Sequence, residues 1–473
     1  MHPPPVDPAP SGSPWRELFA GVGGTAPLRG GGSAPAALLD NAASTPPLRR
    51  VRDAVHEFGD LYSSVHRGTG HTSRVATAAY EEARDTVGRL LGVDPAAQSV
   101  VFLRHTTDAL NRVAAELGHR ADSLVLTTVM EHHANLLPWQ AHGRLVVTGV
   151  DAAGRVDLDA LEAALRRHAG RIAVVAVSGA SNVSGHTPPV HEIAALAHAH
   201  GALIAVDAAQ LVPHRRVDVR PPGDPGHLDI LAFSGHKLYA PYGAGVLVVP
   251  RDFFTGAPQI LGGGAVEFVA LDETLWSGMP EREEAGSPNV IGAVALAIGH
   301  QQLVEELGID ATDAHEVVLA ERLRNALRDL EGIRILGDDP VVRDADRLGL
   351  VSFSVDGVAH GLAAAALAHE WGISVRSGCF CAHPYLMHLL GVSEKDADVM
   401  RDRVRSGDRS ALPGAVRASF APFSTADEVD RLVTAVATIR DHPPDGYVED
   451  RHGHWSPVEG WPATGSIHDL GRG

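Results

Sequence analysis

The chain has 473 residues and a net charge of −18, with 44% hydrophobic and 21% charged residues. This length suffices for a large core shared between two domains, and the composition is typical of a soluble globular protein. The acidic balance argues against a general nucleic-acid binder or a binder of anionic membranes. No apolar run is long enough to span a bilayer, and the first residues lack the basic start and apolar centre of a signal peptide. We therefore expect no nucleic-acid partner and no membrane partner.

The cysteine content indicates the compartment. The chain has two cysteines, Cys379 and Cys381, separated by one residue. This spacing cannot form a disulfide framework, and it fits a reducing compartment. We therefore expect a cytoplasmic location.

Both ends of the sequence differ in composition from its middle. Residues 1–35 are rich in Pro, Gly and Ala and are expected to form a flexible leader. Residues 441–473 are also loop-like, although their Tyr and Trp residues indicate packing on the surface. We treat them as a loop-like tail.

Apolar, strand-like runs alternate with amphipathic, helix-like stretches between these ends. The strand-like runs cover 99–103, 123–129, 145–150, 172–179, 202–208, 229–233 and 245–249. The helix-like stretches cover 73–92, 107–117, 157–169 and 189–200. This alternation predicts an α/β fold in which helices cover a mainly parallel sheet. Ligands in such folds collect at the carboxyl ends of the strands. We assign the large domain to residues 46–300.

A second, smaller unit follows. A long helical pattern covers 289–332, strand-like runs follow at 348–357, 372–378 and 414–420, and helices are expected at 357–370 and 425–440. This pattern predicts a small α+β domain made of residues 36–45 and 301–440. The charged stretch 391–414 interrupts this unit, and we interpret it as a solvated helical insertion.

Lys237 lies in a turn between two apolar strands, within "DILAFSGHKLYAPYGAGVLVVP" (229–250). Burying an ammonium group is costly unless the group is paired or neutralised. Desolvation lowers the pKa of a lysine and suits it to form a Schiff base with a carbonyl. A lone lysine is more often one that reaches solvent, so the neighbouring motifs decide between the two interpretations.

Two polar residues follow another apolar strand, in "ALIAVDAAQ" (202–210). Asp207 needs a cationic partner or several donors if it is buried there. A protonated pyridine nitrogen is such a partner, and pyridoxal phosphate (PLP) enzymes use an Asp in that role. Gln210 can donate to the phenolic oxygen of the same ring. The alternative for Asp207 is a helix N-cap.

The stretch "VFLRHTTDALNRVA" (101–114) predicts a strand, a turn and a helix. Thr106 and Thr107 lie where the helix begins, and backbone N–H groups, the helix dipole and hydroxyls together form an anion site. Ser234 and His236 can donate to the same phosphate. Plain helix capping is the alternative.

Two further motifs supply a flat ring and an amide. His132 in "VMEHHANLLPW" can stack on another flat ring, and Asn182 follows a strand in "VSGASNVSG". A lone histidine is more often a core or surface residue, and this chain has 27 of them.

The ordered series of motifs resembles the class V aminotransferase family, and within it the group II cysteine desulfurase and selenocysteine lyase branch. The series is "EHHANLLPW", "SNVSG", "VDAAQ", "FSGHKLYAPYGAGVL", "EAGSPN", "RSGCFCA" and "VRASF", and it spans about residues 36 to 440. The resemblance implies a PLP-dependent transferase of fold type I that forms a homodimer, with the cofactor near the subunit boundary.

The resemblance also implies a role for each matching residue. Lys237 matches the lysine that links covalently to PLP, and Asp207 matches the partner of the pyridine nitrogen. The stacking ring is His132, Asn182 and Gln210 lie around the phenolic oxygen, and Thr106, Thr107, Ser234 and His236 hold the phosphate. Ser287 matches a hydroxyl that reaches the phosphate from the neighbouring subunit. Arg417, together with Arg376, is expected to bind the substrate carboxylate.

In the desulfurases a thiolate attacks the sulfur of a cysteine already joined to PLP, alanine leaves, and a persulfide remains on the enzyme. The motif "RSGCFCA" places this nucleophile at Cys381. Cys379 occupies a position commonly filled by histidine, and it is either a resolving thiol or a neighbour, the latter being preferred. The "CFC" arrangement and the 391–414 insertion leave the substrate and any sulfur-acceptor protein open.

Three other functions are weighed against a desulfurase acting on L-cysteine. A transaminase, epimerase or C–S lyase on the same scaffold would not need Cys381. A non-enzymatic scaffold would not need the complete polar set. A dinucleotide-binding fold lacks its G-x-G-x-x-G signature here. We expect no metal site, because "RHGHW" (451–455) lies outside any helical or paired-cysteine frame.

Overall fold

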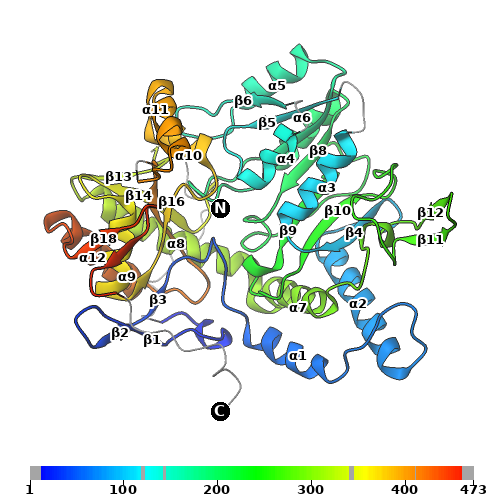
Figure 1. The fold of residues 1–473 in the computed structure, drawn as a ribbon, viewed down its shortest axis with the longest axis horizontal. Coiled ribbons are helices and arrows are strands. Elements are labelled where there is room, and N and C mark those ends of the chain that lie inside the picture. The colour runs from blue at the N-terminus through cyan, green and yellow to red at the C-terminus, as the bar shows by residue number, and fades with distance from the viewer. Residues whose placement is uncertain (1–11, 119–122, 142–144, 340–345, 411, 461–473) are drawn as a thin grey trace, which may run out of the picture.

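The fold is built around two β-sheets (Figure 1). The computed structural model describes residues 12–118, 123–141, 145–339, 346–410 and 412–460. The larger sheet has seven strands in the order β4-β10-β9-β8-β7-β5-β6. Its strands are β4 (Gln98–Leu103), β5 (Leu124–Thr128), β6 (Leu145–Thr148), β7 (Ile172–Ser178), β8 (Leu203–Asp207), β9 (Ile230–Ser234) and β10 (Gly245–Pro250).

The strands of this sheet are mainly parallel. Five of them, β9, β8, β7, β5 and β6, run parallel to their neighbours, whereas β10 is antiparallel to both β9 and β4. The register pairs Ser178 at the end of β7 with Asp207 at the end of β8. Polar residues that follow separate apolar runs in the sequence therefore meet at one edge of the sheet.

Alternate residues of each strand enter two different layers of core. Val174 and Ala176 of β7 pack with α3 (Thr106–Gly118) and α4 (Leu137–Ala141) on one face. Val175 and Val177 pack into the core of the other face, which is covered by α1 (Arg49–Gly59), α2 (His71–Leu90), α5 (Leu158–Arg167), α6 (Val190–Ala199) and α7 (Val290–Gln301). Each fully buried Val contributes about 1.5–3 kcal/mol, so the apolar runs specify this sandwich. The predicted α/β fold with a large, mainly parallel sheet is confirmed.

The smaller sheet is antiparallel and has the strand order β13-β14-β17-β16. These strands are β13 (Ile333–Ile335), β14 (Leu350–Val355), β16 (Arg376–Gly378) and β17 (Ala415–Ser419). Helices α8 (Ile309–Arg328), α9 (His360–Trp371) and α12 (Ala426–Asp441) bury their apolar residues against it. A capping box between Thr425 and Glu428 begins α12. The boundaries of the two domains near residues 46 and 300 stay a proposal.

The predicted helical stretch 289–332 is interrupted. Helix α7 ends at Gln301, a π-helical segment covers Gln302–Gly308, and α8 begins at Ile309. Gly308 has a φ of +79°, which a residue with a side chain adopts only with strain. The apolar periodicity continues across the interruption, and for this reason the sequence pattern predicts a single helix.

The described part of the expected leader is ordered, so the expectation of a flexible segment is wrong for residues 12–35. A 3-10 turn (Arg16–Leu18) precedes Phe19, which is fully buried and packs edge-on against Tyr239 and Phe423. Strands β1 (Thr25–Pro27) and β2 (Ser33–Pro35) pair with each other, and β3 (Ala37–Leu38) pairs with β15 (Ile373–Ser374). The burial of this one aromatic side chain stabilises the segment despite its Pro- and Gly-rich composition.

The charged stretch and the tail contain regular structure. Helix α10 (His383–Leu390) is followed by α11 (Glu394–Arg405), which has no buried residue and thus agrees with a solvated helical insertion. Strands β18 (Tyr447–Glu449) and β19 (Trp455–Pro457) form an antiparallel hairpin. The part of the expected loop-like tail at 461–473 lies outside the described residues. In the described part of the chain, no helix has the length and apolarity needed to cross a bilayer.

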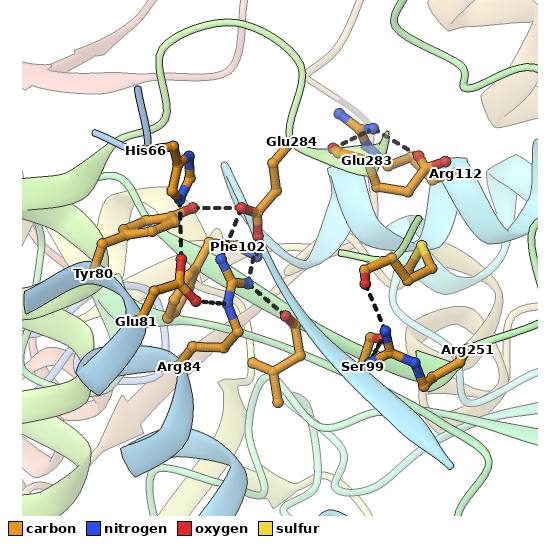
Figure 2. A network of polar contacts seen from close by, with 12 residues as sticks. His66, Tyr80, Glu81, Arg84, Ser99, Phe102, Arg112, Arg251, Glu283 and Glu284 are labelled. Carbon is orange, nitrogen blue, oxygen red and sulfur yellow. Dashed lines mark hydrogen bonds and ion pairs between the residues drawn. The ribbon is translucent and has the colours of Figure 1, made fainter. Parts of the chain in front are cut away.

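Buried ion pairs connect one loop to the edge of the large sheet (Figure 2). Glu284 pairs with Arg84 of α2 at 2.8 Å and accepts hydrogen bonds from Tyr80 and from the backbone N–H of Phe102. Glu283, in the turn Glu281–Glu283, pairs with Arg112 of α3 at 3.0 Å. The loop therefore fixes β4 and α3, the strand and helix that flank the turn at 104–106. Nearby, the ribbon of β11 (Val266–Val269) and β12 (Thr274–Trp276) projects from the large domain (Figure 1).

Candidate active site

A cavity of about 1250 Å³ lies at the carboxyl ends of the large-sheet strands and extends to the small domain. The following predicted site residues line it: Thr106, Thr107, His132, Asn182, Asp207, Gln210, Ser234, His236, Lys237, Arg376, Cys381 and Arg417. The structure thus brings together every predicted site residue except Ser287. Ser287 is exposed on the loop before α7 and is not among the residues that line the cavity.

Lys237 ends the short turn Gly235–Lys237 that follows β9. Burial lowers the pKa of Lys237 to about 8, although the nearby Asp207 carboxylate opposes this decrease. At pH 7 about one-tenth of such an amine is neutral, compared with less than a thousandth of an ordinary lysine. Lys237 is therefore a potential nucleophile at physiological pH.

Asp207 is the last residue of β8 and is only 5% exposed. One carboxylate oxygen accepts a hydrogen bond of 3.1 Å from the backbone N–H of Ala209. No salt bridge to Asp207 occurs within the described ranges, and burial raises the pKa of this carboxyl group. A buried acid with a single backbone donor, facing a cavity, is suited to pair with a cation that enters from outside.

A second buried acid, Glu131, lies behind the site and was missed by the sequence analysis. Its side chain is fully buried and accepts hydrogen bonds of 2.7 Å each from Thr128, Asn135 and Ser178. Burial raises the pKa of Glu131 to about 7, and the negative charge of Asp207 adds to this increase. All three donors are neutral. The acid itself is visible in "EHHAN", but neutral partners leave no charge pattern that marks it as a buried site residue.

His132 presents an uncharged ring to the cavity. Its Nδ1 accepts a hydrogen bond of 3.0 Å from the backbone N–H of Ala134. Burial, followed by the nearby charge of Lys237, lowers the pKa of His132 to about 3. The ring is therefore neutral across the physiological range, as stacking on a flat ligand requires.

Hydroxyls and a helix N-terminus form a polar pocket at the start of α3. Ser234 Oγ accepts a hydrogen bond of 2.9 Å from the backbone N–H of Thr106 and lies 2.7 Å from Thr106 Oγ1. Thr107 is exposed to the cavity, and burial lowers the pKa of His236 beside it to about 4. Gly245 permits this arrangement, because a Cβ there would lie 2.5 Å from the Cα of His105. His105, which also lines the cavity, was not predicted.

Gln210 and Asn182 are both buried amides. Gln210 Nε2 donates to the carbonyl of Ala42 at 2.7 Å, whereas its Oε1 has no hydrogen-bond partner among the described residues. Asn182 Nδ2 donates to the carbonyl of Phe380 at 2.7 Å. Asn182 therefore links the large sheet to the loop that carries the cysteines.

Arg417 is a buried cation between the two domains, only 2% exposed. Its Nη1 donates to the carbonyl of Asn182 at 2.9 Å, and its Nη2 pairs with Asp40 at 3.2 Å. Burial lowers the pKa of Arg417 to about 10, while Asp40 opposes that decrease. Arg376 lies opposite Arg417 in the register of β16 and β17, and it contacts the other oxygen of Asp40 at 3.5 Å. Asp40 was not predicted, because it lies far away in the sequence.

Three hydrogen bonds to backbone carbonyls fix the loop of the two cysteines. The carbonyls of Cys379, Phe380 and Cys381 accept from Ala382 N at 3.0 Å, Asn182 Nδ2 at 2.7 Å and His133 N at 2.7 Å. Phe380 and Cys381 have φ values of +54° and +55°, which cost roughly 1–3 kcal/mol each and persist only where the surroundings enforce them. Cys381 is exposed and close enough to Lys237 and Arg417 to affect the pKa of both. Cys379 is half-buried against the large core.

These residues fit a phosphate-bearing pyridine ring. A buried acid with no salt bridge among the described residues, a neutral flat ring and a lysine with a lowered pKa face one cavity, and hydroxyls with a helix N-terminus lie at its edge. The unpaired oxygen of Gln210 indicates that this set of polar groups is incomplete without a ligand.

Comparison with known proteins gives a consistent result. The Aminotransferase class-V family model matches residues 37–432. A probable cysteine desulfurase 2 of Mycobacterium leprae is 36% identical over 431 residues, which cover 88% of this chain and 93% of that protein. A cysteine desulfurase of Haloferax volcanii is 35% identical over 422 residues, which cover 86% of this chain and 90% of that protein.

Solved structures agree with the sequence relatives. The apo structure of a cysteine desulfurase from Thermococcus onnurineus has a TM-score of 0.74 and 32% identity, and the match covers 86% of this chain and 95% of that chain. A cysteine desulfurase from Escherichia coli has a TM-score of 0.73 and 30% identity, with coverage of 89% and 96%. The resemblance inferred from the ordered motifs is confirmed, and the chain belongs to the class V aminotransferase family.

Proposed function

We propose that this protein is a PLP-dependent cysteine desulfurase, which converts L-cysteine to L-alanine and retains the sulfur as a persulfide on Cys381. The named relatives support the reaction, and the polar groups that face the cavity support the cofactor. The residues of this chain divide into a group that holds the cofactor, a group that binds the substrate and one thiol that accepts sulfur.

The cofactor-holding residues are those at the ends of the large-sheet strands. When bound, PLP supplies an aldehyde that joins amines covalently and a ring that withdraws electrons. Lys237 would attach to it, Asp207 would pair with the ring nitrogen, and His132 would stack on the ring. Gln210 and Asn182 would bind the phenolic oxygen, and the phosphate would be held by Thr106, Thr107, Ser234 and His236.

Substrate binding uses two arginines, and proton transfer uses Lys237. Arg417, with Arg376 beside it, receives the substrate carboxylate, for which a planar guanidinium is the suitable donor. The neutral amine of Lys237 takes the proton from the substrate Cα. Its pKa of about 8 suits an amine that must both accept and return a proton near neutral pH.

Cys381 accepts the sulfur. Its thiol gives up a proton, and Sγ attacks the sulfur atom of the bound cysteine, so that an S–S bond forms as the substrate Cβ–S bond breaks. The electron pair of the broken bond stays on Cβ, which takes up a proton in place of the one lost by the thiol, and the carbon fragment leaves as alanine. The observation that carries this assignment is that three hydrogen bonds fix the cysteine loop within the cavity, close to Lys237 and Arg417.

The test is sulfur release from L-cysteine by the PLP-loaded protein, with alanine and sulfide measured together, with and without a reductant. The Cys381→Ser variant is expected to lose alanine formation by about 10²-fold or more while it keeps the absorbance of bound cofactor. The matched control, Cys379→Ser, is expected to keep its activity. Unchanged turnover in Cys381→Ser would instead support a transaminase, epimerase or C–S lyase that does not use this thiol.

The same proposal includes the assembly and the compartment. A homodimer is supported by Ser287, which is exposed outside this chain's own cavity, and by the exposed Phe268, Val269 and Leu275 of the β11–β12 ribbon. In a homodimer Ser287 would reach the phosphate of the neighbouring subunit. A cytoplasmic location is supported by the requirement that Cys381 stay reduced.

A further inference from the structure

The C-terminal hairpin, residues 447–457, lies against the catalytic cavity. Glu449, His452, Gly453, His454 and Trp455 line the same cavity as Lys237 and Cys381. The hairpin lies outside residues 37–432, which match the family model. A segment beyond the family match therefore contributes to the wall of the site.

Specific contacts attach this hairpin to the small domain. Trp455 covers Gly361 near the start of α9, where a Cβ would lie 2.7 Å from the indole Cδ1. Tyr447 donates a hydrogen bond of 2.9 Å to Glu370 of the same helix. The Arg29 guanidinium lies 4.8 Å from the centre of the Tyr447 ring, donates to the Asp445 carbonyl at 2.6 Å and pairs with Glu459 at 2.6 Å.

A series of contacts connects the hairpin to the cysteine loop. Gly378, next to Cys379, pairs with Ala415 in the register of β16 and β17. The preceding Gly414 abuts His360, because a Cβ on Gly414 would lie 2.3 Å from His360 Nε2. On the hairpin, a Cβ on Gly453 would lie 3.6 Å from the carbonyl of Arg409. Residues 409, 410 and 412–414, the start of α9 and the hairpin thus form one wall, which we call the outer wall.

The cavity that the outer wall lines is larger than a single small-molecule ligand needs. The cavity volume of about 1250 Å³ exceeds the range of about 300–1000 Å³ that is usual for small-molecule sites. A small molecule can therefore approach Cys381 beside the cofactor and substrate sites. The outer wall is lined by the polar and aromatic side chains of Arg409, His360, His452, His454 and Trp455.

We propose that the outer wall selects the sulfur acceptor of Cys381, and that it admits low-molecular-weight thiols in preference to proteins. This inference rests on the proposed desulfurase function. In the transfer, the acceptor thiolate attacks the outer sulfur of the Cys381 persulfide. A new S–S bond forms on the acceptor as the bond to Cys381 Sγ breaks, and the electron pair returns to Cys381 as a thiolate. The proton given up by the acceptor thiol balances that thiolate, so no further oxidant or reductant is needed.

Alkylation of Cys381 with reagents of two sizes tests whether the outer wall limits access to this thiol, and it needs no enzyme turnover. The parent is the full chain with Cys379→Ser, so that Cys381 is the sole thiol. Iodoacetamide is the small probe and a polyethylene-glycol maleimide is the large one. Each rate is divided by the rate with free cysteine, which removes the different reactivities of the reagents. The normalised large-probe rate of the parent is expected to be at least about tenfold below its small-probe rate.

Two variants loosen the hairpin from different sides. Trp455→Ala removes the contact with Gly361, and Arg29→Ala removes the attachment at Tyr447 and Asp445 from outside the cavity. Both are expected to raise the large-probe rate by about fivefold relative to the small-probe rate. Val448→Ala is the matched control, because Val448 is 54% exposed on the same hairpin and does not line the cavity. Equal size discrimination in the parent, Trp455→Ala and Arg29→Ala would overturn the proposal.

A sulfur-transfer experiment separates this proposal from the desulfurase proposal. The PLP-loaded parent is charged with L-cysteine and then mixed with glutathione or with a small protein that carries one exposed cysteine. In the parent, glutathione is expected to take up sulfur faster than the protein thiol does. Arg29→Ala is expected to reduce the ratio of these two transfer rates. Faster transfer to the protein thiol in the parent would overturn acceptor selection. Absence of alanine would contradict the desulfurase function, whereas the alkylation result would still decide whether the wall limits access.

Discussion

The inner and outer ends of the catalytic cavity are built in different ways. The inner end consists of residues at the carboxyl ends of neighbouring strands, such as Asp207 at the end of β8 and Lys237 after β9. The outer end combines the strained loop at Cys381 with residues 409, 410 and 412–414 and with the hairpin 447–457, which Arg29 attaches from near the N-terminus. The parallel sheet itself brings the inner residues together, whereas the outer ones meet through contacts between distant segments.

This difference suggests that the two ends carry separate properties. The inner residues are largely buried in the large core, so a substitution there changes charge in a medium of low dielectric constant and has a large effect. The outer residues are mostly exposed, and their contributions are screened by solvent. We expect the inner end to set how cofactor and substrate react, and the outer end, apart from the Cys381 thiol itself, to set access to the site, and three substitutions test this division.

The largest effect is expected at Asp207. Asn at this position removes the buried acid that we propose faces the ring nitrogen, and turnover should fall by about 10²–10³-fold, the equivalent of losing one member of a buried charge pair. The pH dependence should also change. The Asp207 carboxylate raises the pKa of Lys237, so its loss lets that pKa fall below about 8. The rate at which apo-protein captures PLP, followed by absorbance, should then reach its plateau at a lower pH.

A surface acid provides the control for that shift. Asp224→Asn replaces a carboxylate away from the cavity and should leave the pH midpoint of PLP capture unchanged. A midpoint that stays constant or rises in Asp207→Asn would contradict the proposed electrostatic link between Asp207 and Lys237.

The second effect concerns the stability of the ion-pair network that holds β4 and α3 beside the inner end of the cavity. Glu284→Gln removes the buried carboxylate that pairs with Arg84 and leaves that cation only the 45% exposed Glu81, so it should lower the free energy of unfolding by about 3–5 kcal/mol. The matched control is Glu305→Gln, whose partner Arg89 is 55% exposed, and it should cost no more than about 1 kcal/mol. Urea unfolding of both variants measures the difference. Equal losses would show that the network in Figure 2 does not stabilise this edge of the sheet.

The inner end is also the part that the sequence predicts well. Each of its residues directly follows an apolar run or starts a helix, and the rule that strand ends share an edge was enough to group Asp207, Ser234 and Lys237. Glu131 escaped because its partners are neutral, so no charge pattern marks it. The α/β architecture followed from the same alternation of apolar runs and amphipathic helices.

The outer end resisted prediction because its contacts are distant in the sequence. Asp40 meets Arg417 across almost the whole chain, and Phe19 is anchored by Tyr239 and Phe423. Composition predicted a flexible leader and a loop-like tail packed on the surface, whereas aromatic and arginine contacts hold short strands in the described parts of both. The sequence marks neither the left-handed backbone at Phe380 and Cys381 nor the glycine that receives Trp455.

The smallest effect is expected for Arg417 and Arg376, which both contact the Asp40 carboxylate where the two ends of the cavity meet. Arg417 is 2% exposed, and its Nε has no hydrogen-bond partner within the described part of the chain, whereas Arg376 has a 53% exposed side chain. Arg417→Lys replaces a planar donor by a point charge and should raise the KM for L-cysteine by about 10–100-fold, with a smaller change in kcat. Arg376→Lys should change KM by less than about threefold, since its ion pair with Asp40 is screened. Steady-state kinetics of both variants tests the division directly. A larger KM effect at Arg376 would mean that an exposed outer residue, rather than the buried one, binds the substrate carboxylate.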